Sequence, residues 1–69
     1  MIARVVLYFN GMVTVFDDKD QQMPDYQGRL MDVRERVLAD APERAEFRIG
    51  AWDYGTRIID RRLWSCFRY

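Results

Sequence analysis

The sequence contains no histidine, only one cysteine and no long apolar run. A zinc site would therefore lack its commonest ligands, and a nucleophile paired with histidine cannot be built. The single Cys66 excludes an internal disulfide and is typical of a reducing compartment. The N-terminal residues lack the basic and apolar regions of a signal peptide, and no apolar run is long enough to span a bilayer. We therefore expect a cytoplasmic protein with no membrane partner.

The chain also lacks a net charge. Its 11 basic and 11 acidic residues balance, so no overall field attracts nucleic acid or an anionic membrane. The distribution is uneven, because residues 12–35 are predominantly acidic and residues 56–69 are predominantly basic. Ten of the 11 basic residues are arginine, whose planar fork pairs with carboxylates and stacks on aromatic rings. The C-terminal segment is therefore the region best suited to contacts with a partner.

Patterns of catalytic and metal-binding residues are missing as well. The glycines are scattered and form no phosphate loop, and no serine nucleophile motif occurs. An EF-hand loop starting at Asp18 would place Met23 and Arg29 where glycine and glutamate are required. No spacing singles out a pair of carboxylates, and we interpret Cys66 as a structural residue. We therefore expect neither an enzyme nor a bound metal or cofactor.

The strongest structural signal is a β-hairpin over residues 5–16. Two runs of β-branched and aromatic residues flank Asn10-Gly11, which favours a two-residue type I′ turn. This turn fixes the predicted register of the two strands. On one face of the sheet the pairs are Phe9 with Met12, Leu7 with Thr14, and Val5 with Phe16. On the other face they are Tyr8 with Val13 and Val6 with Val15. Both faces of the predicted hairpin are apolar, unlike those of a sheet with one wet side.

The remaining segments predict one helix and two or three further strands. Apolar residues at helical spacing predict a helix over 26–40, with its stripe formed by Tyr26, Leu30, Val33, Val37, Leu38 and Ala41. Strict alternation predicts a strand over 45–52, and residues 56–60 should pair back along it. Residues 61–69 fit either a strand or a helix, and their aromatic content favours the strand.

Together these segments predict a single compact domain over residues 1–69, of the α+β class. The expected order is β-β-α-β-β, an antiparallel sheet of about four strands with one helix on one face. A chain of 69 residues is close to the lower limit for a single core without disulfides or metals. The uncovered face would carry Val6, Tyr8, Val13 and Val15, which we interpret as a self-association face that would form a homodimer.

The candidate partner-binding residues are arginines and large aromatic residues, the types most common at binding hot spots. They are Tyr8, Trp52, Arg57, Arg61, Arg62, Trp64, Arg68 and Tyr69. The leading hypothesis is a non-enzymatic protein-interaction module. One example would be a small phage or mobile-element inhibitor, such as an anti-defence protein, that binds a larger protein or nucleoprotein complex in the host cytoplasm. The alternative is binding of single-stranded nucleic acid by the arginines and aromatic rings of residues 57–69.

Overall fold

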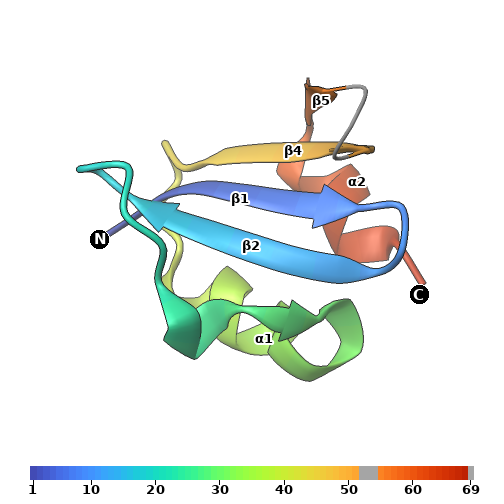
Figure 1. The fold of residues 1–69 in the computed structure, drawn as a ribbon, viewed down its shortest axis with the longest axis horizontal. Coiled ribbons are helices and arrows are strands. Elements are labelled where there is room, and N and C mark those ends of the chain that lie inside the picture. The colour runs from blue at the N-terminus through green and yellow to red at the C-terminus, as the bar shows by residue number, and fades with distance from the viewer. Residues whose placement is uncertain (52–54, 69) are drawn as a thin grey trace.

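The structure is a computed structural model that describes residues 1–51 and 55–68 (Figure 1). Within these ranges the chain forms a five-stranded sheet in the order β3-β2-β1-β4-β5. The elements are β1 (Ile2–Tyr8), β2 (Met12–Asp17), the 3₁₀ turn η1 (Pro24–Tyr26), β3 (Gly28–Arg29), α1 (Leu30–Asp40), β4 (Glu46–Ala51), β5 (Gly55–Ile59) and α2 (Arg61–Cys66).

The predicted class is confirmed, since the chain forms a small α+β domain with a mostly antiparallel sheet and one main helix. The sheet is mixed rather than purely antiparallel, because β1 and β4 run parallel. Between these two strands the chain passes through β2, β3 and α1 before it returns beside β1 (Figure 1). A parallel pair requires such a long connection, whereas the antiparallel pairs are joined by short turns.

The hairpin turn has three residues rather than the predicted two. The amide N–H of Gly11 donates to the carbonyl oxygen of Tyr8 at 2.9 Å, and Gly11 has a φ of 87°. The side-chain oxygen of Asn10 accepts from the amide of Met12 at 3.0 Å. Only the glycine needs a left-handed conformation in such a loop, whereas a type I′ turn needs two residues with positive φ. The predicted type I′ turn is therefore wrong, and the register moves by one residue to pair Leu7 with Val13.

This shift turns β2 over relative to the prediction. Val13 and Val15 are 2% and 0% exposed and belong to the core, while Phe16 takes their place on the opposite face. A change of register by one residue always exchanges the two faces of a strand. The predicted self-association face is therefore wrong as a surface, because Val13 and Val15 do not share a face with Val6 and Tyr8.

The main helix begins four residues later than predicted. Residues 24–26 form a 3₁₀ turn, and Gly28 has a φ of 145°, a backbone conformation that a helix cannot contain. Gly28 instead pairs with Val13 in the short strand β3. The predicted apolar stripe is confirmed. Its members Leu30, Val33, Val37 and Ala41 are buried in the core, and Tyr26 and Leu38 pack against it.

The alternation predicted for the fourth strand is also confirmed. Phe47 is 2% exposed in the core, while Glu46 and Arg48 form an ion pair on the other face. At Gly50 a Cβ atom would lie 2.3 Å from the carbonyl oxygen of Gly55, so glycine is needed for β5 to approach. The last residue of the predicted strand, Trp52, lies outside the described residues.

The C-terminal segment forms the helix α2, so the favoured strand prediction is wrong. The carboxylate of Asp60 caps this helix by accepting the amide N–H of Arg62 at 2.7 Å. Trp64 is fully buried, with its ring centroid 4.9 Å from that of Phe47 in an edge-on arrangement. Residues of α1 and α2 share one core, so both helices cover the same face of the sheet (Figure 1).

Candidate functional site

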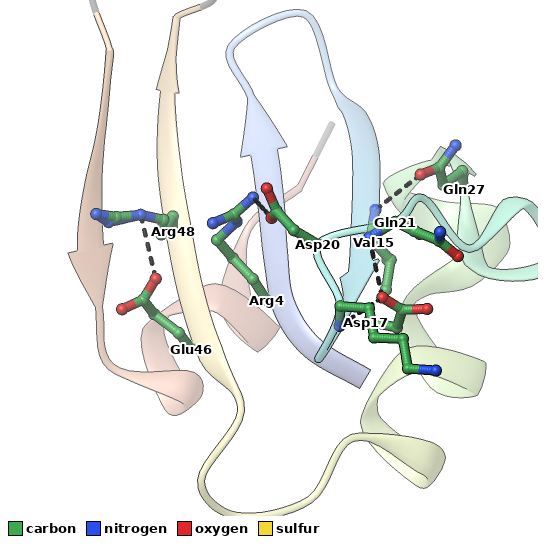
Figure 2. A network of polar contacts seen from close by, with 9 residues as sticks. Arg4, Val15, Asp17, Asp20, Gln21, Gln27, Glu46 and Arg48 are labelled. Carbon is green, nitrogen blue, oxygen red and sulfur yellow. Dashed lines mark hydrogen bonds and ion pairs between the residues drawn. The ribbon is translucent and has the colours of Figure 1, made fainter. Parts of the chain in front are cut away.

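The helix-free face of the sheet carries two ion pairs (Figure 2). Arg4 pairs with Asp20, and its guanidinium also lies 4.4 Å from the ring centroid of Phe16. Arg48 pairs with Glu46 at 3.4 Å. Each of these arginines is already matched by a carboxylate, so these pairs give the face no net charge with which to attract an anionic partner.

This face is also less apolar than the sequence suggests. Val6, at its centre, is only 4% exposed, and Tyr8 is half-buried. A shallow depression on this face is lined by Val6, Tyr8 and Phe16 together with Arg4 and Arg48. The aliphatic stems of long charged side chains can cover apolar surface in this way. Over the residues that the structure describes, this face therefore does not present the contiguous apolar patch on which the dimer hypothesis was based.

The carboxylates of Asp17 and Asp40 have roles in local structure. Asp17 accepts the amide N–H groups of Gln21 and Lys19 at 2.9 Å each, which closes the acidic loop (Figure 2). The hydrogen bond from Gln21, followed by that from Lys19, lowers the pKa of Asp17 below its usual 3.8. The Tyr26 hydroxyl donates to Asp40 at 2.5 Å, which raises the pKa of Tyr26 above 10.0. Residues 1–51 and 55–68 contain no group of three or more side chains placed to hold a metal ion.

Arg61, one of the predicted binding residues, is bonded within the fold. Its guanidinium donates to the carbonyl oxygens of Leu38, Ala41 and Pro42 at distances of 2.8–3.1 Å. It also lies 5.2 Å from the ring centroid of Phe47. These carbonyls lie at the C-terminal end of α1, where no further helical turn satisfies them. Arg61 therefore ties α2 to the end of α1.

The aromatic residues of the C-terminal segment also belong to the core. Trp64 is 0% exposed, and Phe67 is half-buried and packed against the core. The carbonyl oxygen of Phe67 accepts a hydrogen bond from Arg34 of α1, which places this end of the chain beside α1. Arg68 is exposed and follows α2 in the sequence. Among the described C-terminal residues, Trp64 and Arg61 are therefore part of the fold rather than of an exposed surface.

Of the predicted C-terminal residues, Arg57 on β5 and Arg62 on α2 are both exposed. Each has an exposed apolar neighbour, Ile58 at 62% and Leu63 at 60%. In the part of the chain that the structure describes, neither guanidinium takes part in an ion pair. We call these four residues of β5 and α2 the basic edge surface. Of the other predicted residues, Tyr8 lies on β1, two strands away from β5.

Trp52 and Tyr69 were also predicted as binding residues, and they lie outside the described ranges.

The outer edge of β5 presents backbone N–H and C=O groups whose direction could not be predicted from the sequence. The carbonyl oxygen of Gly50 accepts the amide N–H of Phe9 at 3.1 Å, so Gly50 bonds toward β1 and away from β5. Thr56 lies opposite Gly50 in the antiparallel pair and is therefore not hydrogen-bonded to it. Hydrogen-bonded and non-hydrogen-bonded pairs alternate along such strands, so Ile58 is likewise not hydrogen-bonded to Arg48, two residues away. The N–H and C=O groups of Thr56 and Ile58 consequently point outward from the sheet.

A concave region of about 490 Å³ adjoins this edge at the turn end of the sheet. Its lining includes Phe9, Ile49 and Arg57. The ring of Phe9 is 60% exposed, although the sequence placed this residue in the hairpin ladder rather than in its loop. Phe9 and Arg57 therefore line the same concave region at this end of the sheet.

Comparison with known protein families, with curated proteins and with solved structures finds no match to this chain. Among the helices within residues 1–51 and 55–68, none is long and apolar enough to cross a membrane.

Proposed function

We propose that this protein is a non-enzymatic protein-interaction module that binds its partner through the basic edge surface. The observation that carries the proposal is that Arg57 and Arg62, and the apolar residue that follows each of them in the sequence, are all exposed on β5 and α2. Arginines without an ion-pair partner in the described structure can bind carboxylates of another protein, and adjacent apolar side chains add area that is buried on association. A small inhibitor or accessory factor of a larger protein, of the kind that phages and mobile elements encode, would act in this way.

The geometry favours a protein partner over single-stranded nucleic acid. Binding of single strands relies on exposed rings on which bases stack. Trp64 is fully buried and Phe67 is half-buried, so the described part of the C-terminal segment supplies no exposed ring of its own. The exposed ring that lines a concave region with Arg57 is that of Phe9, from the hairpin loop. The net charge of zero also provides no general attraction to phosphates.

A charge-reversal experiment tests this proposal. The immobilised protein is incubated with lysate of the cells that produce it, and retained proteins are identified by mass spectrometry. We expect a specific protein to be retained by the original chain and to fall by more than about tenfold with the double substitution Arg57→Glu and Arg62→Glu, a loss equivalent to about 1.4 kcal/mol.

The matched control is Arg29→Glu with Arg44→Glu, which makes the same change in charge at two exposed arginines outside β5 and α2. This control should retain the partner. Equal retention by both double variants would contradict the assigned surface. Release of the bound material by nuclease would point to nucleic acid instead.

A further inference from the structure

We propose that the partner binds as an additional strand, in which an extended acidic segment of another protein pairs with the outer edge of β5. This inference rests on the proposed function and names the chemistry of the partner. It is carried by the orientation of the β5 backbone, which is an observation independent of the exposed arginines.

The backbone of β5 offers a complete short ladder to an incoming strand. Thr56 and Ile58 each direct one N–H and one C=O outward, which gives two donors and two acceptors. No strand within residues 1–51 and 55–68 pairs with this edge. The opposite edge is β3, which has only two residues. An exposed edge of this kind is a template for addition of a strand from another chain.

The side chains of β5 define the pattern that the incoming strand should have. Arg57 lies opposite Ile49, on the face that the helices cover, while Ile58 lies opposite Arg48 on the open face. Side chains of neighbouring strands meet on the same face. The incoming segment should therefore place acidic residues beside Arg57 and a β-branched or other apolar residue beside Ile58, in alternation.

The charge of this edge favours an acidic partner over a second copy of the chain. Two copies of β5 paired antiparallel about a two-fold axis at its central residue would place Arg57 opposite Arg57. Like charges in that position destabilise a strand pair. Residues 57–62 contain three arginines against one carboxylate, Asp60, whose oxygen already caps α2. Because Arg61 is bonded to the end of α1, the exposed positive charge of this stretch is that of Arg57 and Arg62, and an acidic segment along β5 would meet opposite charge at Arg57.

Selection from a random twelve-residue peptide library on phage, with the protein immobilised, tests the inference. We expect the selected peptides to carry net negative charge and to alternate acidic with β-branched residues. Synthetic copies should bind Arg57→Glu at least about tenfold more weakly than the original chain.

The matched pair Ile58→Pro and Ile58→Ala separates the backbone contribution from that of the side chain. The Ile58 amide points outward, so proline removes no hydrogen bond of the existing sheet and is acceptable on an edge strand. Ile58→Pro should weaken binding by more than about tenfold, and Ile58→Ala by less than about fivefold. An unchanged amide NMR spectrum away from β5 confirms that the proline variant is folded.

Neutral or basic selected peptides, absence of enrichment, or full binding by a folded Ile58→Pro variant would overturn the added strand. A dimer that light scattering detects and that Ile58→Pro dissociates would also overturn it, because it would assign the edge to a second copy. In each case the lysate experiment still tests the proposed function, because the retention of a partner that depends on Arg57 and Arg62 does not require the partner to pair as a strand.

Discussion

Replacing Trp64 with alanine should lower the free energy of unfolding by about 3–5 kcal/mol. The side chain is 0% exposed and packs edge-on against Phe47, so its removal leaves a large cavity between α2 and the sheet. A domain of this size has a total stability of only about 3–10 kcal/mol. The variant should therefore be largely unfolded, or should unfold at much lower urea concentration, when followed by circular dichroism.

Leu63→Ala is the control, because Leu63 lies on the same helix but is 60% exposed. This substitution should change stability by less than about 0.5 kcal/mol. If Trp64→Ala unfolds at the same urea concentration as the original chain and instead loses its partner, Trp64 is a binding residue and its burial in the core is incorrect.

Replacing Arg61 with alanine should lower the free energy of unfolding by about 2–3 kcal/mol. Its guanidinium donates to three carbonyl oxygens at the end of α1, which would lose these donors. Arg61→Lys should recover little of the loss, because an ammonium group lacks the planar fork that reaches several acceptors together. Thermal unfolding of the two variants beside the original chain measures both effects.

The neighbouring substitution Arg62→Ala provides the comparison, since the Arg62 side chain is exposed. It should leave stability within about 0.5 kcal/mol of the original value. Equal loss of stability at both positions would contradict the assignment of Arg61 to the fold and of Arg62 to the surface.

The hairpin shows how far local sequence determines this fold. Asn10-Gly11 correctly predicts a turn with a left-handed glycine, and Gly11 has that conformation. A two-residue and a three-residue loop both accommodate this pair, and they differ by one residue in register. Because both faces of the hairpin are apolar, the local sequence pattern does not indicate which of the two loops, and hence which register, is formed. Packing against α1 determines the register, because it buries Val13 and Val15 in the core.

The C-terminal segment shows why residue type alone did not identify the site. Trp64 and Arg61 belong to the types that are common at binding hot spots, yet here they fill the core and bond to α1. The helix α2 has only six residues, which is too short for its period to separate it from a strand. Besides the helical spacing of its apolar residues, Asp60, a good helix N-cap two residues before Arg62, was a local signal for a helix at this position.

The main helix and β4 were more predictable, because each buries one face with a clear period. The stripe that includes Leu30 and Val37 and the alternation around Phe47 both match the observed core. The edge position of β5 was not predictable from these patterns. It depends on the parallel pairing of β1 with β4, a contact between segments far apart in the sequence.

Amide hydrogen exchange measured by NMR along β5 is the most direct test of the open edge. The geometry predicts that the Thr56 and Ile58 amides, which point outward, exchange at least about tenfold faster than the Arg57 amide, which bonds to Ile49. That alternation would show an edge open to an incoming strand. Exchange as slow at Thr56 and Ile58 as at Arg57 would show that another part of the chain or a second copy already covers the edge, and would contradict the proposed mode of binding.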